Sequence, residues 1–448
     1  METYLGIALD LGSTSIKCAG LREDGNFTVI TQCKAPALHH EDKKVTGDAL
    51  AYVDKCIELL NFAKLKTKSK TALSLTCQRS SFLVWEKVTG ELLSPMISWQ
   101  DRYYGSENLS EEHKEKVREI SGLVPSPYYL GPKLKGWFGE NNKRVQSDIC
   151  VGTLDSYLVW RLSQKREFII DASMAARTAL FDIHQGCWSD VLLKLYSIDQ
   201  SVLPKLTSTC NLNIELDSHW LLKSMSADQS ASLCGHEPNP RDICLNFGTG
   251  VFVMKVLSKK STWQRYYQNA LYYKDKDFQY FNEGAVNGLT RSLELCRVNL
   301  DSSPIVENDF FCRVDASGLG APHWRPNCEF MTSSKDFYDC SHTIRRSVFI
   351  EGLCFRVLEM IEDLKESESR IIISGGMTHD GVLVQTLASL LEGGLLKCSE
   401  SETSLRGAFK FIRRIQIPIV FEKVILPQSK YLRGKYEKWR VWMKSIID

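Results

Sequence analysis

This sequence lacks several features that would assign or exclude a class of protein at once. None of its 15 cysteines forms a Cys-x-x-Cys pair, so neither the ligand spacing of a zinc site nor a disulfide framework is indicated. No apolar run reaches the length that spans a bilayer, and the first residues carry neither the basic nor the apolar segment of a secretory signal. We therefore expect a cytoplasmic protein with no membrane partner, whose scattered cysteines are small core residues.

An excess of charge of one sign is also missing. The 56 lysines and arginines stand against 54 aspartates and glutamates, for a formal net charge of +2. Such a balance gives no electrostatic argument for a nucleic-acid partner. The basic run 64–70 is most simply a solvated loop, because no aromatic residue interrupts it. What the chain does have is size: 448 residues, 43% of them hydrophobic, are enough for about two or three domains.

The hydrophobic pattern predicts alternating strands and helices, without an internal repeat. In the first half we expect a meander of three strands at 4–9, 16–21 and 27–31, followed by a helix at 48–63. A buried strand at 72–75 and a hairpin with arms at 82–85 and 91–96 complete this half. In the second half we expect strands at 243–247, 252–256 and 371–373, a turn at 283–288, and helices at 289–296, 342–365, 386–391 and the C-terminal end.

A carboxylate follows the first predicted strand and precedes a turn of glycine and hydroxyl residues. Asp10 is followed by Gly12, Ser13, Thr14 and Ser15. An oxygen ligand such as Asp10 can hold the water shell of Mg²⁺, and the N–H and hydroxyl groups of the turn can face phosphate oxygens. An equally simple interpretation is a β-hairpin with an acidic corner.

A second carboxylate, Asp228, precedes a run of small residues, and the turn Gly248-Thr249-Gly250 follows another apolar run. In a phosphoryl-transfer enzyme such a carboxylate can accept the proton of an attacking hydroxyl. A glycine-rich turn can present backbone N–H groups to phosphate oxygens. Read singly, each motif is more simply a structural loop.

Polar clusters follow two more of the predicted strands. One is Gln78-Arg79-Ser80, and the other is Trp99 with the residues up to Arg102. Open α/β sheets bind ligands at the rim formed by the ends of their strands, and an aromatic ring beside amide, carboxylate and guanidinium groups offers a surface for a sugar or polyol. The alternatives are a surface salt-bridge network and a tryptophan that fills the core.

Taken in chain order, these motifs resemble those of the FGGY family of carbohydrate kinases, above all its glycerol kinase branch. The likeness covers nearly the whole chain, and the ordered co-occurrence is more specific than any single motif. It rests on the segments 10–15, 78–79, 99–102, 126–128 with Lys133, 152–158, 171–173, 176–178, 227–229, 247–250, 318–324, Arg345 with 351–352, and 374–376.

The resemblance implies an α/β protein made of two RNase H-like domains of the actin/hexokinase-type ATPase fold, closing on a central cleft. We place the boundary in the polar, proline-bearing stretch 235–240. An N-terminal domain at 1–236 would then hold the polyol and the first phosphate loop, and a C-terminal domain at 237–448 would bind the nucleotide. The partner would be a small polyol or sugar, and a homodimer is left open.

The resemblance also implies residue roles in the phosphorylation of a primary hydroxyl with ATP and Mg²⁺. Asp228 would be the catalytic base, and Asp10 would organise the metal. The substrate would be bound by Gln78, Arg79, Ser80, Trp99, Tyr128, Asp228, Gln229 and Phe252. ATP would be bound by Gly12, Ser13, Thr14, Ser15, Gly248, Thr249, Gly250, Gly375, Gly376 and Asp380.

Departures from the family pattern favour a second interpretation. Ser80 stands where glycerol kinases carry a glutamate that accepts hydrogen bonds from two substrate hydroxyls, and losing such a charge-assisted contact costs about 1.5–3 kcal/mol. The step 327–329 replaces a common Ala-Arg-Gly, and Ser374 and Asp380 differ around the adenosine-binding turn. The sequence therefore predicts an active polyol or sugar kinase, in which Ser80 suggests a bulkier polyol or ketose or weak activity. The alternative is a catalytically weak or inactive FGGY pseudokinase that acts as a ligand-binding or regulatory protein. An actin- or chaperone-like ATPase is disfavoured by the polyol-type cluster.

Overall fold

The structure is a computed structural model, and it describes residues 4–105, 109–141, 148–248, 250–258, 264–274, 277–301, 303–413 and 417–447. The chain divides into unit 1, made of Met1–Gly235, Asn269–Tyr280 and Thr403–Pro418, and unit 2, made of His236–Gln268, Phe281–Glu402 and Ile419–Asp448. Segments from the second half of the chain thus join unit 1, whereas the sequence-based division placed all of 237–448 in one domain. Among the described helices, none combines the length and the apolar character that crossing a membrane requires.

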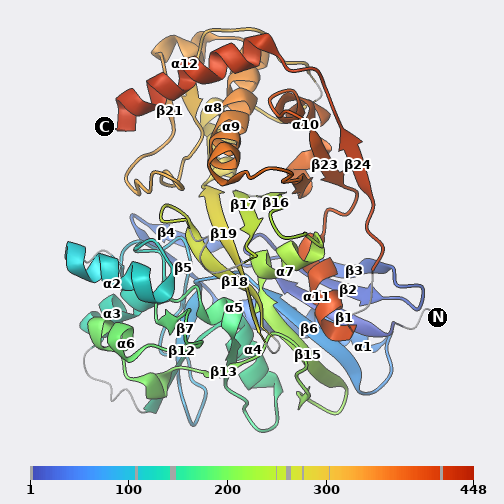
Figure 1. Cartoon of the computed structure of the whole chain (residues 1–448). Coiled ribbons are helices and arrows are strands. Elements are labelled where there is room, and N and C mark those ends of the chain that lie inside the picture. Colours follow the sequence, from blue (N-terminus) through green and yellow to red (C-terminus); the bar gives the residue numbers. More distant parts are fainter. Residues whose placement is uncertain are drawn as a thin grey trace. The chain divides into compact units, whose positions relative to one another are not determined.

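Unit 1 is built on a six-stranded sheet of order β14-β15-β6-β1-β2-β3 (Figure 1). The strands are β1 (Gly6–Leu11), β2 (Ser15–Leu21), β3 (Phe27–Lys34), β6 (Thr71–Cys77), β14 (Ile214–Glu215) and β15 (Trp220–Ala227). The first of them form the antiparallel meander that the apolar runs predicted. On the other side of β1, β6 and β15 follow in parallel. The carboxyl ends of β1, β6 and β15 therefore share one edge of the sheet.

Unit 1 also contains a five-stranded sheet of order β4-β5-β8-β7-β9 and two short strand pairs. Their strands are β4 (Leu38–Glu41), β5 (Lys44–Gly47), β7 (Phe82–Glu86), β8 (Met96–Ile97), β9 (Ile149–Thr153), β10 (Ile169–Asp171), β11 (Phe181–Asp182), β12 (Cys187–Trp188) and β13 (Lys205–Thr207). The second arm of the expected hairpin forms only in part: Leu92 makes a single bridge with Trp85 of β7, and β8 starts after Pro95, which has no N–H to donate.

The helices of unit 1 include one from near the end of the chain. They are α1 (Ala49–Lys64), α2 (Glu111–Ser121), α3 (Leu130–Glu140), α4 (Leu154–Leu162), α5 (Ala172–Ala175), α6 (Asp190–Tyr196), α7 (Asp228–Gly235) and α11 (Thr403–Arg413). Figure 1 shows α11 beside α7 and the six-stranded sheet. A Cβ on Gly407 of α11 would lie 1.8 Å from the carbonyl oxygen of Ala231 in α7. Glycine is therefore what lets these helices touch, and their contact brings the start of α11 to the edge of the sheet.

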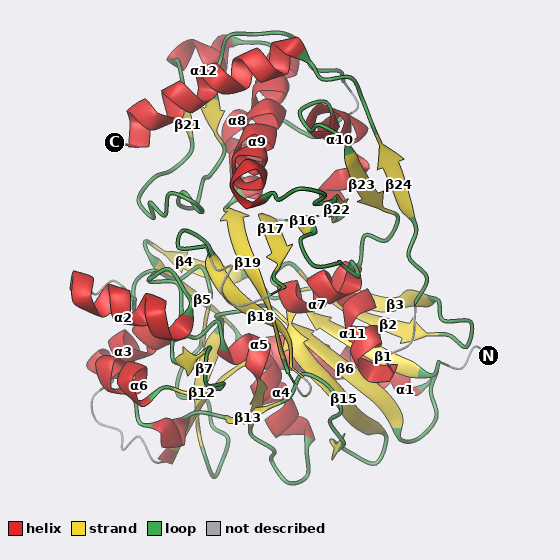
Figure 2. Cartoon of the chain, viewed as in Figure 1, coloured by secondary structure: helices red, strands yellow, loops and turns green. Residues whose placement is uncertain are grey.

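A seven-stranded sheet has the order β18-β19-β17-β16-β22-β23-β24 (Figure 2). Unit 2 is built on the strands of this sheet from β19 to β24 in that order. The strands are β16 (Ile243–Phe247), β17 (Val251–Val256), β18 (Gln268–Lys274), β19 (Phe278–Val286), β22 (Ile371–Ser374), β23 (Leu395–Cys398) and β24 (Phe421–Val424), with the short pair β20 (Cys312–Arg313) and β21 (Met331–Thr332). The turn expected at 283–288 is wrong in its first part, because β19 continues to Val286.

The helices of unit 2 are α8 (Leu289–Cys296), α9 (His342–Leu364), α10 (Gly381–Ala388) and α12 (Lys430–Ile447). The helix α9 crosses the core of the unit, and Figure 2 shows α12 lying across it. The stretch 386–391, predicted to be helical, lies in α10 only up to Ala388, and the helix itself begins at Gly381. The reason is that Asp380 caps it, its Oδ1 accepting hydrogen bonds from the N–H groups of Val382 and Leu383 at 2.9 and 3.2 Å.

Candidate active site

The functional residues that the sequence predicted after separate strands lie together at one edge of the unit 1 sheet. In the strand register, Leu11 and Ala227 each pair with Cys77. The residues that follow these strands, Gly12 after β1, Gln78 after β6 and Asp228 after β15, therefore leave the sheet side by side. This is the place where parallel α/β sheets bind ligands.

The turn after β1 has the shape and the open hydroxyl groups expected of a phosphate loop. A Cβ on Gly12 would lie 2.7 Å from the carbonyl oxygen of Ser15, so the turn needs glycine there. Thr14 is exposed and Ser13 is half-buried. From below, the hydroxyl of buried Tyr52 donates a 2.7 Å hydrogen bond to the carbonyl oxygen of Gly12, and burial raises the pKa of this phenol. The loop is therefore held by a residue that the sequence pattern did not single out.

Asp10 is contacted by a residue from α11. The Ser404 hydroxyl donates a 3.0 Å hydrogen bond to Asp10 Oδ2. No sequence signal connects the two positions, because α11 reaches the sheet only through the packing of unit 1. Among the described residues, no group of three or more His, Cys, Asp or Glu side chains could hold a metal ion. One carboxylate with nearby hydroxyls suits Mg²⁺, which keeps most of its water and takes few protein ligands.

Asp228 lies beside Arg79 at the neighbouring strand end. Arg79 Nε is 3.4 Å from Asp228 Oδ1, and the backbone N–H of Gln229 donates to the same oxygen at 2.7 Å. The Asp228 side chain is 26% exposed, so a ligand can reach it. The arrangement gives a partly accessible carboxylate whose charge is balanced by a buried guanidinium.

A buried relay holds the backbone immediately before Asp228. The N–H of Ala227 donates to Ser173 Oγ at 2.9 Å, and this hydroxyl donates to Asp171 Oδ1 at 3.0 Å. Thr209 donates to the other oxygen of Asp171 at 2.9 Å. The sequence marked 171–173 only as a family-like segment, and the structure shows that it supports the candidate base.

The two segments predicted to bind the polyol are joined through the hydroxyl of the buried residue Ser81. Ser81 Oγ donates to Gln78 Oε1 at 3.3 Å and accepts from the N–H of Trp99 at 2.9 Å. Ser80 has a left-handed backbone conformation (φ 63°), which a residue other than glycine adopts only where its surroundings hold it. The side chains of Gln78 and Arg79 are mostly buried, and Trp99 is half-buried.

Tyr128 lies just before α3, half-buried. Burial raises the pKa of its phenol, and the neighbouring Arg102 opposes that shift. The phenol therefore stays protonated at neutral pH and can donate a hydrogen bond to a substrate oxygen.

The glycine turns of unit 2 follow the adjacent parallel strands β16 and β22. A Cβ on Gly375, whose φ is 95°, would lie 2.4 Å from the carbonyl oxygen of Phe247, so only glycine fits. Gly376 is exposed, with no atom within 4 Å of a Cβ built on it. Gly248 is exposed and Gly250 half-buried, whereas Thr249 lies outside the described residues.

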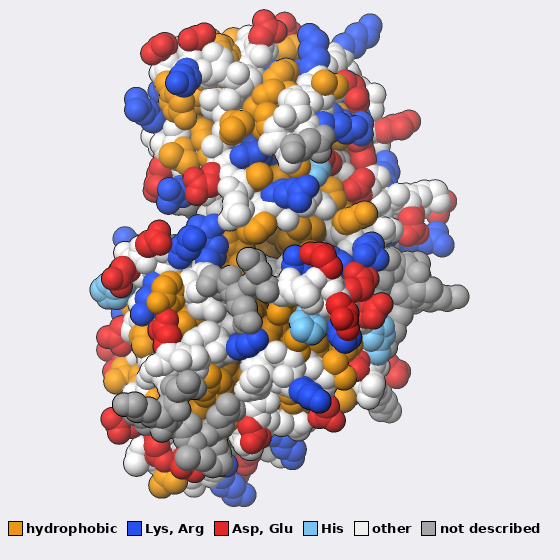
Figure 3. All heavy atoms as spheres, turned by 90° about the vertical axis from the view of Figure 1, so that its left-hand side faces the viewer, with side chains coloured by type: hydrophobic (Ala, Val, Ile, Leu, Met, Phe, Trp, Pro, Cys, Tyr) orange, Lys and Arg blue, Asp and Glu red, His pale blue; other side chains and the backbone are white. Residues whose placement is uncertain are grey.

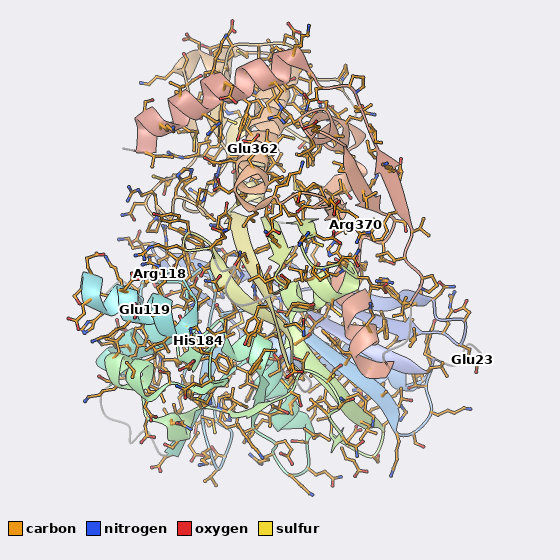
Figure 4. The ribbon with its side chains drawn as sticks, viewed as in Figure 1. Glu23, Arg118, Glu119, His184, Glu362 and Arg370 are labelled. Carbon is orange, nitrogen blue, oxygen red and sulfur yellow. The ribbon has the colours of Figure 1, made fainter. Side chains whose placement is uncertain are left out.

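At the opposite end of these strands an ion pair fixes their register. Arg370 Nε lies 3.0 and 3.1 Å from the two carboxylate oxygens of Asp242, and Figure 4 labels Arg370 at the start of β22. The carboxylate raises the pKa of Arg370 further. With both strands pinned at one end, the turns at Gly248 and Gly375 share the other end. Just before Gly375, Ser374 Oγ lies 2.7 Å from Nε2 of buried His236.

Asp380 and Phe252 are placed differently from the glycines. Both carboxylate oxygens of Asp380 serve the protein itself, one as the cap of α10 and the other in a 2.8 Å contact with buried Arg346. A role of Asp380 in nucleotide binding would therefore be indirect, through the start of α10. Phe252 lies half-buried on β17 of unit 2, and its contact with a polyol stays a prediction.

Solved structures show the class of protein that this fold defines. A xylulose kinase from Lactobacillus acidophilus matches with a TM-score of 0.84 and 18% identity, covering 98% of this chain and 98% of that chain. Plasmodium falciparum glycerol kinase with ADP matches with a TM-score of 0.80 and 19% identity, covering 100% of this chain and 98% of that chain. At these identities the likeness shows the fold, and it confirms the predicted α/β architecture of the actin/hexokinase type.

Sequence comparison gives the family. The model of the "FGGY family of carbohydrate kinases, N-terminal domain" matches residues 5–222. The glycerol kinase of Methylobacterium nodulans is 27% identical over 448 residues, covering 91% of this chain and 88% of the relative. The chain carries the N-terminal domain of the FGGY family of carbohydrate kinases, and over 91% of its length it is glycerol kinase-like. Its enzyme class is the ATP-dependent carbohydrate kinase, and the family resemblance predicted from the motifs is confirmed.

Proposed function

We propose that this protein transfers the γ-phosphoryl group of ATP to a primary hydroxyl of a small polyol or sugar. The observation that carries the proposal is the shared edge of β1, β6 and β15, which presents Asp10, Arg79 and Asp228 from adjacent parallel strands. A carboxylate to organise a metal, a guanidinium to bind substrate and a carboxylate base are groups that phosphoryl transfer to an alcohol uses together.

Asp228 would accept the proton of the attacking hydroxyl as the hydroxyl oxygen bonds to the γ-phosphorus, while the bond from that phosphorus to the β–γ bridging oxygen breaks and ADP leaves. The contacts from Arg79 and the N–H of Gln229 fix the orientation of Asp228, so that the base does not need to be positioned during the reaction. A positioned base contributes about 10²–10⁴-fold. Substrate positioning and neutralisation of phosphate charge would supply most of the remaining acceleration.

The glycine turns would hold the nucleotide. In unit 1 the N–H and hydroxyl groups of residues 12–15 would face the β- and γ-phosphates, and in unit 2 the turn 248–250 would do the same. Gly375 and Gly376 would meet the α-phosphate or ribose side, since their lack of side chains lets a ligand approach the backbone closely. Mg²⁺ would neutralise charge on the phosphates. Asp10 would hold its water ligands, with Ser404 orienting the carboxylate.

The acceptor would lie against Arg79, Trp99 and Tyr128. Ser80 argues against glycerol as the best acceptor, because its short hydroxyl is turned to the carbonyl oxygen of Arg177 at 3.3 Å. A hydroxyl already engaged in this way does not replace a carboxylate that accepts from two substrate hydroxyls. A larger polyol or a ketose, which brings further hydroxyls to the site, is therefore the substrate class that we propose.

A second candidate function is a ligand-binding FGGY pseudokinase. The observation that favours it is the engagement of both Asp380 oxygens within the protein, at a position expected to touch the nucleotide.

Charge gives no sign of a nucleic-acid partner: on the face in Figure 3, acidic and basic side chains are mixed. A homodimer and a cytoplasmic location stay predictions from the sequence.

A coupled ADP-release assay separates the two functions. The wild type is tested with Mg²⁺ and ATP against glycerol, erythritol, xylulose and ribulose, with Asp228→Ala as the control. We expect acceptor-dependent ADP release that the substitution abolishes, while ATP still raises the melting temperature of the variant. ATP binding without release on any acceptor would favour the pseudokinase, and wild-type turnover by Asp228→Ala would remove Asp228 from the base role.

A further inference from the structure

Unit 1 contains a lysine that the mechanism above does not use. Lys133 belongs to α3, and its side chain is 0% exposed. Lysine is almost never fully buried unless its ammonium group is paired or hydrogen-bonded, because leaving water carries a large free-energy cost. Burial lowers the pKa of Lys133 to about 7, an effect that the charge of Asp101 opposes. A group that is this costly to bury needs a structural or functional reason.

The hydrogen bonds of Lys133 end on the two segments predicted to bind the acceptor. Its Nζ donates to the carbonyl oxygen of Ser98 at 2.7 Å and to that of Ser80 at 2.9 Å. Ser98 directly precedes Trp99, and Ser80 directly follows Arg79. One ammonium group thus bridges the backbones beside both of these side chains.

The surroundings of Lys133 hold the ammonium group at this bridge. The ring of Phe82 lies below it, with the centroid 5.8 Å from Nζ. Asp101 is itself held by the backbone N–H groups of Val45 and Tyr104, at 2.9 and 3.2 Å from its carboxylate oxygens. Loss of one proton does not break the bridge, since a neutral amine still has two N–H donors for two carbonyl oxygens.

We propose that Lys133 is a positioning residue that clamps the segments 78–81 and 98–101 to each other, and so sets the spacing of Arg79 and Trp99 for the acceptor. This inference rests on the proposed function of those two residues. The hydrogen bond from the N–H of Trp99 to Ser81 is a second tie between the segments. Without the bridge through Lys133, only the second link remains, so the segments separate more readily and the acceptor must order them when it binds. The effect falls on the KM of the acceptor, because Lys133 donates to the backbone beside Arg79 and Trp99 and, among the described residues, makes no hydrogen bond to the glycine turns for ATP.

A second buried lysine provides a matched control. Lys435 in α12 of unit 2 is 5% exposed, and its Nζ donates to Glu351 Oε2 at 2.7 Å and Asn308 Oδ1 at 2.6 Å. Burial lowers the pKa of Lys435 as well. Lys435→Met therefore also removes a buried ammonium group, here one paired with the buried carboxylate of Glu351, at a place with no predicted acceptor-binding residue.

The experiment compares Lys133→Met, Lys133→Arg and Lys435→Met by steady-state kinetics with the acceptor that the wild type prefers. For Lys133→Met we expect the acceptor KM to rise about tenfold or more, as for a lost charged hydrogen bond, with less than about a threefold change in the KM of ATP. Lys133→Arg keeps the charge and the donors and should recover part of the loss. Equal changes in both KM values, or the same acceptor effect in Lys435→Met, would overturn the clamp.

Hydrogen exchange tests the clamp independently of turnover. In Lys133→Met the backbone amides of 78–81 and 98–101 should exchange faster than in the wild type, while Lys435→Met should leave both segments unchanged. Unaltered exchange in these segments would overturn the proposal. If the Met variant does not fold, Lys133→Arg is judged by the same two readouts. A wild type that phosphorylates no acceptor refutes the proposed function, and the exchange result still decides the clamp.

Discussion

The hydroxyl of Ser404 donates a hydrogen bond to Asp10 across 3.0 Å, although 394 positions separate the two residues in the sequence. Asp10 is the residue before the last in β1, and Ser404 is the second residue of α11, close to the end of the chain. The contact exists because α11 packs on α7 through glycines and joins unit 1. The candidate metal-organising carboxylate is thus oriented by the last helix of its own unit.

From this contact we predict that Ser404→Ala weakens the binding of Mg²⁺ with ATP without unfolding the protein. Without its donor, the Asp10 carboxylate can rotate away from the water ligands of Mg²⁺. The Mg²⁺ concentration that gives half of the thermal stabilisation by ATP should rise about tenfold, at the low end of outer-shell effects on metal affinity. The measurement is a thermal-shift titration of Mg²⁺ at fixed ATP.

The matched control for Ser404→Ala is Ser232→Ala. Ser232 Oγ lies 2.7 Å from the hydroxyl of Thr403, the neighbour of Ser404, within the same contact between α7 and α11. This variant loses a buried hydrogen bond of that helix contact and leaves Asp10 untouched. If both variants shift the Mg²⁺ midpoint equally, the effect belongs to the packing of α11 and not to Asp10.

The relay behind Asp228 yields a prediction about kcat. Ser173→Ala removes the acceptor for the buried N–H of Ala227, which leaves the backbone before the base without its partner at a cost of about 1–3 kcal/mol. A displaced base transfers the proton less efficiently, so kcat should fall about tenfold, while the KM of ATP stays within about twofold. Steady-state kinetics at saturating acceptor provides the measurement.

Ser94→Ala is the corresponding control within unit 1. Ser94 Oγ accepts a 2.9 Å hydrogen bond from the buried N–H of Val84, so this substitution orphans the same type of donor far along the chain from Asp228. Both variants should lose similar thermal stability, but only Ser173→Ala should lose kcat. Equal losses of kcat would mean that the relay contributes stability alone.

How far the sequence predicted the site depends on how local each signal is. Asp10, Gln78 and Asp228 each follow an apolar run, so parallel pairing of those runs was enough to place them at one edge. The contacts of Ser404 and Lys133 arise from packing between segments that are distant in the sequence, and no pattern in the neighbouring residues predicts such contacts. Gly284 misled the turn prediction for a physical reason: it lies inside β19, where a Cβ would come within 2.6 Å of Met360 Sδ. That glycine serves close packing rather than a turn.

From the buried carboxyl group of Asp155 we predict an unusual dependence of the folding stability on pH. Its carboxyl group is fully buried in α4, and burial raises its pKa to about 6 from 3.8. Between these values the folded state binds more protons than the unfolded state, so stability falls as the pH rises from about 4 to 6 and stays lower above that. Asp155→Asn removes the buried charge and should stabilise unit 1 at pH 8 by about 1–3 kcal/mol. The gain should shrink toward pH 4.

Chemical unfolding between pH 4 and 8 checks this prediction, with Asp171→Asn for comparison. Asp171 is equally buried, but its two oxygens accept from Ser173, Thr209 and the N–H of Met174. Replacing one of its oxygens by an NH₂ group puts a donor against these donors and should destabilise the unit at every pH. Destabilisation by Asp155→Asn at pH 8 would contradict the assignment of a penalised charge to Asp155.

Ser80 yields the prediction about acceptor choice. If Ser80 occupies the position of the carboxylate that glycerol kinases use, Ser80→Glu restores an acceptor for two hydroxyls of a small polyol. We expect kcat/KM for glycerol to rise about tenfold, in line with one regained charge-assisted hydrogen bond. The same change should lower kcat/KM for the larger acceptor that the wild type prefers, because the longer side chain takes up its space. Steady-state kinetics with both acceptors measures the switch.

Ser80→Gln separates charge from size in this experiment. Glutamine has the length of glutamate but accepts through one neutral oxygen, so it should exclude the larger acceptor without improving glycerol. The left-handed backbone at Ser80 is equally unfavourable for both longer side chains, which makes the pair a fair comparison. Equal gains for glycerol with Glu and Gln would mean that charge is not the missing element. No gain with either would show that the side chain at position 80 does not contact the acceptor.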